Sequence, residues 1–202
     1  MTVQPRTRTQ ADTPTKTPAP TPTPSTAERI RSACARATGA MVATDGLDPT
    51  PTPVVHLLCD GSVALTIPSS SALTATVATA GAAGVQAVLE LTDYAPLPLR
   101  EPVRSLVWIR GRLWTVQDRD VPALLDLIAA SNPHPALLEV NSTQGHDVLM
   151  RLEIESVVAA DSTGAESVAV GALLDEHLGM LLAGPRECGV EFLGSVDPDG
   201  DA

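Results

Sequence analysis

The feature that most restricts the fold of this chain is a succession of short aliphatic segments with the two-residue period of β-strands. Turns rich in proline and glycine separate the segments, which cover residues 41–44, 54–58, 62–67, 85–92, 103–116 and 148–160. Helical patterns come at irregular intervals, unlike the steady alternation of strand and helix in a doubly wound sheet. This order predicts an α+β fold, an antiparallel β-barrel with two or three flanking helices, whose closure would remove open strand edges.

Glycine and proline predict how the strands connect. Asp60-Gly61 stands between two apolar runs, which is a strong signal for a β-hairpin. Gly111 interrupts the run over residues 103–116 and indicates a bulge or a tight reversal, so we expect a long strand pair there. Prolines at 49, 51 and 53 predict an irregular connection, and residues 137–140 are expected to form a short edge strand.

Three segments carry the signals of helices. Ser25 and Glu28 form a capping box before a stripe of small and aliphatic residues that predicts the first helix. The serine run at 69–71 can cap a second helix over residues 72–79, because serine hydroxyls accept from free N–H groups. A further apolar stripe predicts a third helix over residues 118–130.

The two ends of the chain differ from its middle. Residues 1–26 contain nine Thr and six Pro and carry a net charge of +2, a composition too polar to bury a core. We expect this stretch to be a disordered tail with polyproline-like segments. Residues 27–170 are expected to form the barrel domain, and residues 171–202 a short helix followed by an acidic, disordered C-terminus.

Charge and lysine content exclude several functions. The chain has 13 Lys and Arg against 24 Asp and Glu, a net charge of −11, whereas a nucleic-acid binder needs a basic face. Its single lysine is Lys16, in the N-terminal tail. The barrel therefore has no lysine for phosphate-binding loops or Schiff-base chemistry. With only four aromatic residues, the core must be built from Ala, Val, Leu and Ile.

Cysteine spacing and hydropathy favour a cytoplasmic protein. Cys34, Cys59 and Cys188 include no pair at two-residue separation, so zinc and thioredoxin-like motifs are absent and we expect reduced thiols. Cys34 falls on the apolar stripe of the first helix and is expected to be a small core residue. The sequence contains no run of 18 apolar residues and no secretory signal. We predict no membrane partner.

Several stretches together resemble a known superfamily. They are Ala27-Glu28-Arg29-Ile30, Ala40-Met41-Val42-Ala43-Thr44, the hairpin at Asp60-Gly61, residues 104–113 and residues 149–154. In this order they resemble the FMN-binding split-barrel superfamily, which includes pyridoxamine phosphate oxidases and HugZ-type haem-degrading proteins. The resemblance implies a split β-barrel that forms a homodimer and holds a planar anionic cofactor, haem or flavin, at the subunit interface. The small helical domain that follows some of these barrels is expected to be missing or truncated.

The candidate binding residues are basic, hydroxylic and aromatic. Arg104, Arg110 and Arg112 suit an anionic ligand because guanidinium groups hold phosphate or propionate bidentately. A solvated strand face paired with glutamates is the alternative interpretation. Trp108 could stack on a flat cofactor, or instead form a core or dimer contact. Ser69 and Ser70 follow the third strand, where flavin-binding relatives place phosphate-binding hydroxyls, although the accompanying histidine of those relatives is missing.

Two functions remain open at this point. One is a split-barrel protein that binds haem or flavin and is linked to haem utilisation or flavin-dependent redox chemistry. The other is a barrel without a cofactor that acts as a regulatory or scaffold module for protein partners. No residue can be assigned a catalytic role, and no histidine has the neighbours of a metal site, so we predict no metal.

Overall fold

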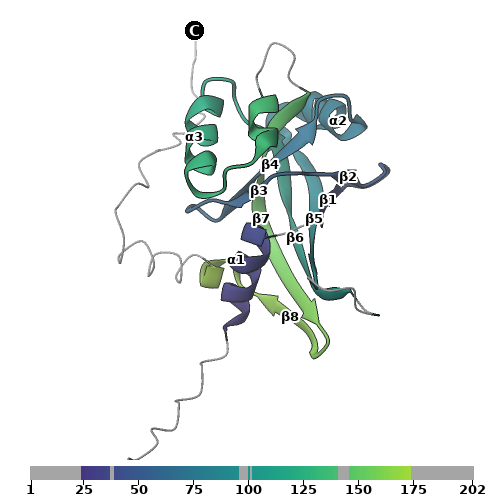
Figure 1. The fold of residues 1–202 in the computed structure, drawn as a ribbon. Coiled ribbons are helices and arrows are strands. Elements are labelled where there is room, and N and C mark those ends of the chain that lie inside the picture. The colour runs from purple at the N-terminus through teal and green to yellow at the C-terminus, as the bar shows by residue number, and fades with distance from the viewer. Residues whose placement is uncertain (1–23, 37–38, 96–99, 101, 141–145, 174–202) are drawn as a thin grey trace, which may run out of the picture.

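The computed structural model describes residues 24–36, 39–95, 100, 102–140 and 146–173. The expectations for the N-terminal tail up to residue 23 and for the segment beyond residue 173 lie outside the described residues. The labelled α-helices are α1 (Thr26–Arg36), α2 (Ala72–Ala80) and α3 (Val121–Ser131), with two short 3₁₀ helices, η1 (Gly81–Ala83) and η2 (Pro135–Glu139), and residues 170–173 are also helical (Figure 1). The strands are β1 (Gly39–Ala43), β2 (Thr50–Pro51), β3 (Val55–Leu57), β4 (Ser62–Pro68), β5 (Val85–Tyr94), β6 (Val103–Thr115), β7 (Asp147–Asp161) and β8 (Gly164–Val168).

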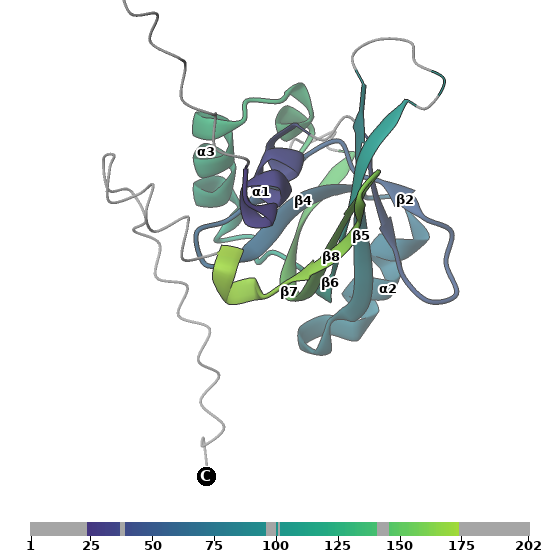
Figure 2. The same cartoon turned by 90° about the horizontal axis from the view of Figure 1, so that it is seen from below.

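All eight strands belong to one antiparallel sheet. Its order is β2-β1-β5-β6-β7-β4-β3, and β8 pairs with the far end of β7. The long strands β5, β6 and β7 bend so that the sheet curls around its own core, with α1 and α2 lying on different parts of it (Figure 2). The α+β split barrel is therefore confirmed. Full closure is not, because the described pairing runs from β2 to β3 without joining those two strands.

The core is aliphatic and has two parts. The larger cluster lies inside the curl and includes Ile30 of α1 and Leu73 of α2 with inward residues of β4, β5, β6 and β7. A second cluster lies beneath α3 and includes Val121, Leu124 and Ile128. This aliphatic core agrees with the composition, which contains few aromatic residues. Cys34 belongs to the larger cluster, and burial raises the pKa of its thiol to about 12, as expected of a core residue.

The local signals in the sequence are largely confirmed. The capping box is reciprocal, since the Glu28 N–H donates to Ser25 Oγ at 3.1 Å and the Ser25 N–H donates to Glu28 Oε2 at 2.7 Å. Ser71 caps α2 by accepting from the Thr74 N–H at 3.1 Å. Gly61, with φ of +82°, lies in the turn that joins β3 to β4.

Three local expectations are wrong. Residues 103–116 form one bent strand rather than a strand pair, and the bulge opposite Gly111 places the extra residue, Glu155, in β7. Residues 137–139 belong to η2, which Pro135 can start, and only Val140 pairs with the sheet, through an isolated bridge to Asp147. The proline-rich connection contains a two-residue strand, β2, whose Pro51 stands at the sheet edge where proline is tolerated.

Two further features bear on the environment of the protein. Among the described residues, no helix has the length and apolar character needed to cross a bilayer. Cys34 is a free thiol, whereas Cys59 is disulfide-bonded, which contradicts the expectation that all thiols are reduced.

Candidate functional site

The inner face of the curled sheet changes from apolar to polar at the end beside α1. Leu91, Val107 and Ala159 stand in register across β5, β6 and β7, and all three are buried. Two residues further towards this end, the next inward row is polar and consists of Asp93, Ser105 and Asp161. Because strand side chains alternate between faces, this polar row continues the core on the same face. It replaces apolar packing where the barrel opens.

Helix α1 presents a polar stripe to the same opening. Arg29, Ser32 and Arg36 are spaced by three and four residues, so they share one side of the helix. Ile30 and Cys34, on the neighbouring stripe, are buried in the core and fix the helix against the sheet. The amphipathic pattern of α1 thus holds two guanidinium groups near the polar row.

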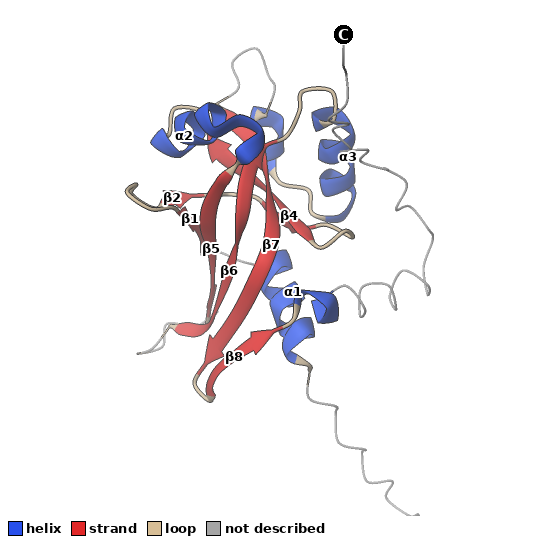
Figure 3. Cartoon of the chain, turned by 180° about the vertical axis from the view of Figure 1, so that it is seen from behind, coloured by secondary structure: helices blue, strands red, loops and turns tan. Residues whose placement is uncertain are grey.

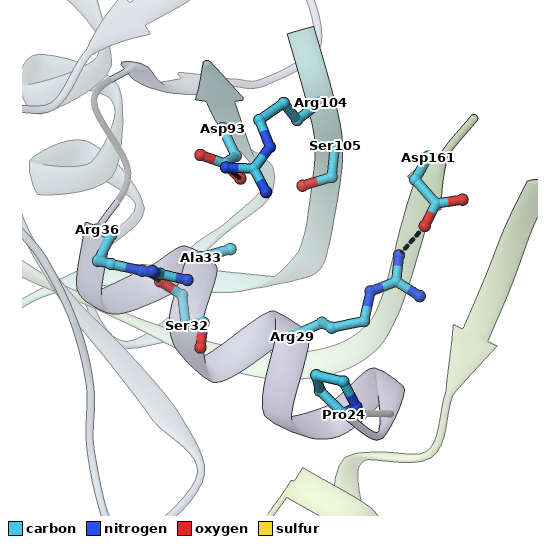
Figure 4. Close-up of a pocket in the computed structure, with 9 residues that line it drawn as sticks. All are labelled: Pro24, Arg29, Ser32, Ala33, Arg36, Asp93, Arg104, Ser105 and Asp161. Carbon is cyan, nitrogen blue, oxygen red and sulfur yellow. Dashed lines mark hydrogen bonds and ion pairs between the residues drawn. The ribbon is translucent and has the colours of Figure 1, made fainter. Parts of the chain in front are cut away.

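These two sets of residues enclose a cavity of about 280 Å³, which we call the arginine pocket. Figure 4 shows guanidinium groups reaching towards it from α1 and from β6 (Figure 4). Its lining consists of Pro24, Arg29, Ser32, Ala33, Arg36, Asp93, Arg104, Ser105 and Asp161.

Arg29 and Asp161 form the most constrained pair in the arginine pocket. The Arg29 guanidinium donates to Asp161 Oδ2. The other oxygen of Asp161 accepts from the Thr163 N–H at 2.8 Å and from the Thr163 hydroxyl at 2.5 Å. The Thr163 hydrogen bonds, with a smaller contribution from Arg29, lower the pKa of Asp161 below its ordinary range. Asp161 is therefore an ionised carboxylate fully engaged by its neighbours.

The other two arginines are less engaged. Arg104 Nη1 is 4.0 Å from Asp93 Oδ2, and the Arg104 side chain is 60% exposed. Arg36 donates through Nε to the Ser32 carbonyl of its own helix at 3.4 Å, and it has no carboxylate partner in the described part of the chain. Three guanidinium groups and two carboxylates give the arginine pocket one net positive charge, in a chain whose net charge is −11.

A smaller cavity of about 230 Å³ lies on the other side of Arg36 and is lined in part by Cys34 and His134. His134 Nδ1 accepts from the Ala136 N–H at 3.1 Å, so this nitrogen is occupied in capping η2. The raised pKa of the Cys34 thiol keeps it protonated and a poor nucleophile. These groups are structural.

The predicted site residues occupy three separate places. Arg104 alone lines the arginine pocket. Trp108, Arg110 and Arg112 lie on the outer face of β6, with Arg110 about 20 Å along the strand from Arg104 at ~3.3 Å per residue. Arg112 donates to the Ala83 carbonyl at 2.8 Å.

Ser69 and Ser70 lie at the opposite end of β7 from Arg104. They follow Pro68, which pairs with Asp147 at the beginning of β7, whereas Ser105 pairs with Asp161 at its end. Both serines are exposed in the turn before α2. One chain therefore does not bring the serines and the arginines together. A shared cofactor site for all of them stays a prediction.

Sequence reasoning missed most of the arginine pocket. Arg29, Arg36, Asp93 and Asp161 were not singled out, because the capping box drew attention to the helix start and the apolar stripe to its core face. The spacing of Arg29, Ser32 and Arg36 is a visible signal of one polar stripe. The in-register row across three strands was not visible, because it depends on the bulge in β7.

The outer face of the sheet carries a second row of residues in register. It runs from Met41 through Glu90 and Trp108 to Val158. Trp108 Nε1 donates to Glu90 Oε2 at 2.8 Å, which satisfies the indole N–H and leaves its ring on the surface. Figure 3 shows β5, β6 and β7 in front, with no helix over their central part (Figure 3). Met41 is 41% exposed.

Comparisons with known proteins support the fold. No family model matches the chain, and no curated protein matches it. Among solved structures, a haem-binding protein from Mycobacterium smegmatis is 17% identical, with a TM-score of 0.51 over 81% of this chain and 70% of that one. Campylobacter jejuni ChuZ is 10% identical, with a TM-score of 0.53 over 71% of this chain and 58% of ChuZ.

A third solved structure is a protein from Clostridium acetobutylicum, related to general stress protein 26 and described as belonging to the pyridoxinephosphate oxidase family. It is 12% identical, with a TM-score of 0.50 over 73% of this chain and 96% of that one. These identities establish architecture alone. The chain has the split-barrel fold of the FMN-binding-like proteins.

Proposed function

We propose that this chain is a ligand-binding split barrel whose arginine pocket holds the anionic group of a small molecule. The observation that carries the proposal is the placement of Arg29, Arg36 and Arg104 around one cavity in a strongly acidic chain. Like charges gathered in this way repel each other unless an anion lies between them. Two carboxylates offset only part of that charge.

The chemistry of the lining suits an oxyanion. Guanidinium groups donate in a planar fork that matches carboxylate and phosphate oxygens. Ser32 and Ser105 add hydroxyl groups to the lining, and no other described residue accepts a hydrogen bond from either of them. Arg36 and Arg104 are the two residues we expect to contact the ligand, because Arg29 is already engaged by Asp161.

Haem and flavin fit the arginine pocket only in part. A propionate or a phosphate group matches the guanidinium lining, but a cavity of about 280 Å³ is at the lower limit of sites for whole organic ligands, roughly 300–1,000 Å³. Among the described residues, the lining contains no aromatic ring to stack on a flavin and no His, Cys, Met or Tyr to ligate iron. The ring of such a ligand would lie outside the pocket. The proposal therefore covers binding and assigns no redox step.

Replacing Arg36 with alanine is expected to weaken anion binding by roughly tenfold to a hundredfold, the usual worth of a charged hydrogen bond. Arg104→Ala is expected to act in the same direction with a smaller effect, because Asp93 already competes for its guanidinium. Calorimetric titration of the full chain with propionate and methyl phosphate measures both effects. Absorption titrations with haemin and FMN show whether either cofactor supplies the anion.

The matched control for these variants is Arg112→Ala. It removes the same charge from the protein, but Arg112 lies on the outer face of β6 and donates to a backbone carbonyl. Its affinity for anions should equal that of the wild type. Equal losses in Arg36→Ala and Arg112→Ala would reduce the effect to overall charge and contradict the proposal, as would the absence of anion binding by the wild type.

The same proposal includes a homodimer formed through the outer face of the sheet. The row through Met41, Trp108 and Val158 is apolar except for Glu90, and the Trp108 indole is already hydrogen-bonded. A surface of this kind is typical of a protein contact, since single chains keep few large apolar patches. This face also supports the second candidate function, a scaffold module whose partner is another protein.

Met41→Lys is expected to convert the dimer to a monomer without loss of folding. In the monomer, a lysine at position 41 stands opposite Glu90 in the ladder and forms a favourable cross-strand pair with it. In the dimer, the same lysine charge would be buried at the interface, which is costly. Light scattering coupled to size-exclusion chromatography measures the mass. Leu138→Lys is the control, because Leu138 is 79% exposed on η2. A dimer that persists in Met41→Lys would refute this interface.

The cytoplasmic location expected from the sequence conflicts with the disulfide at Cys59. In that compartment the cellular thiol pools would keep Cys59 reduced, whereas the disulfide described here is typical of an oxidising environment. Neither the arginine pocket nor the outer face contains Cys59. The binding proposal is therefore independent of the state of this residue.

A further inference from the structure

We infer that Asp93 lowers the preference of the arginine pocket for doubly charged oxyanions, such as phosphate monoesters, relative to singly charged ones such as carboxylates. This inference rests on the proposed function, because it concerns the ligand of the same site. Asp93 is then a residue that determines specificity through its charge, and it need not contact the ligand.

The two carboxylates of the arginine pocket differ in their partners. Asp161 accepts hydrogen bonds from Arg29 and from both the N–H and the hydroxyl of Thr163. Arg29 and Asp161 therefore form a neutral pair that an incoming anion gains little by breaking. Within the described part of the chain the Asp93 carboxylate accepts no hydrogen bond, and Arg104 Nη1 lies 4.0 Å from its Oδ2, beyond hydrogen-bonding distance. It is the carboxylate that a ligand must face.

Apart from the neutral pair of Arg29 and Asp161, the arginine pocket contains three charged groups. Arg36 and Arg104 supply two positive charges and Asp93 supplies one negative charge. A ligand with one negative charge therefore makes the group neutral. A ligand with two negative charges leaves an excess negative charge beside a carboxylate that is only 35% exposed.

Asp93 has a fixed position within the lining of the arginine pocket. Asp93 pairs with Ser105 in the ladder between β5 and β6, and Ser105 pairs in turn with Asp161. The strand backbone thus fixes Asp93 on the floor of the pocket opposite α1, whereas the Arg104 side chain is largely exposed and can turn from Asp93 towards a ligand (Figure 4). A ligand held by Arg36 and Arg104 would lie close to Asp93 and could not move it away.

The expected effect follows from Coulomb's law. Removing the charge of Asp93 removes a repulsion proportional to the charge of the ligand. In a partly exposed pocket, we expect Asp93→Asn to raise the affinity for a singly charged anion about threefold. The affinity for a doubly charged anion rises by the square of that factor, about tenfold. The relative preference for the dianion therefore rises about threefold in Asp93→Asn.

The experiment titrates the full chain with propionate and with methyl phosphate at pH 8, where the phosphate ester carries close to two charges because its second pKa is about 6. The proteins compared are the wild type, Asp93→Asn, the charge-retaining variant Asp93→Glu, and Asp126→Asn. Asp126 lies exposed on α3 and its replacement changes the net charge of the protein by the same amount as Asp93→Asn. Circular dichroism confirms that each variant folds.

A rise in the preference for methyl phosphate in Asp93→Asn, absent from Asp93→Glu and Asp126→Asn, supports the inference. Anion binding with the same preference in all four proteins overturns the inference and leaves the proposed function intact. The absence of binding of either anion to the wild type and to Asp93→Asn overturns both. If Asp93→Asn fails to fold, Asp93→Ser replaces it, and an unchanged preference in that variant is equally fatal to the inference.

Discussion

Gly111→Ala is expected to destabilise the barrel by about 3 kcal/mol or more, one of the largest effects of any single methyl group in this chain. A Cβ atom at Gly111 would lie 1.8 Å from the Glu153 carbonyl oxygen and 2.8 Å from the Glu153 carbonyl carbon. Both atoms belong to the backbone of β7, so no side-chain rotation can relieve the overlap. The two longest strands would have to separate at the bulge that sets their register.

Thermal and urea unfolding of the purified variant measure this loss. For a chain of this length, 3 kcal/mol corresponds to a fall in Tm of about 10 °C. Gly171→Ala is the matched control, because Gly171 has no atom within 4 Å of the added methyl group and does not require a positive φ. Its free energy of unfolding should not fall below that of the wild type, because Gly171 is helical and alanine is the better helix former. Equal effects of the two substitutions would show that β6 and β7 are not in close contact at the bulge.

The sequence predicted an irregularity at Gly111 but did not predict its form. A glycine within an apolar β-type run indicates an irregularity, and the structure confirms a bulge at this point. The sequence did not say which strand holds the extra residue, because that depends on pairing with β7, which begins 36 residues after Gly111 in the chain. The expected strand pair was wrong for the same reason. A single strand can continue through a glycine when its partner supplies the bulge.

Elements with local causes were predictable from the sequence. The capping box at Ser25, the cap at Ser71 and the turn at Gly61 each depend on residues within three or four positions of each other. Short stretches of sequence determine secondary structure of this kind. The antiparallel split barrel followed from the order of these elements, together with the absence of a regular alternation of strand and helix.

The arginine pocket was not predictable in the same way. It joins α1 to the ends of three strands, so its residues are separated by as many as 137 positions in the chain. Of the six residues proposed from the sequence, only Arg104 lies in it. Clustering along β6 was the wrong criterion, because Arg110 lies about 20 Å along the strand from Arg104, on the outer face of the sheet.

Ile30→Ala is the second substitution with a large expected effect, a loss of about 3 kcal/mol within the range of 2–5 kcal/mol for buried aliphatic truncations. The Ile30 side chain is fully buried in the larger core cluster, and α1 packs against β3, β5 and β8. Truncation leaves a cavity between the helix and the sheet that neighbouring side chains can fill only partly. Urea unfolding measures the loss.

The consequence of Ile30→Ala for the arginine pocket follows from the geometry of α1. Ile30 lies next in sequence to Arg29, and the same helix carries Arg36, so a loosened helix displaces two of the three guanidinium groups. Anion affinity should therefore fall together with stability, although no residue that lines the pocket has been changed. Leu138→Ala is the control, since Leu138 is 79% exposed and its truncation should alter neither quantity by a measurable amount. If Ile30→Ala lost stability but bound propionate as tightly as the wild type, the arginines of α1 would not contribute to binding, and the pocket would depend on Arg104 alone.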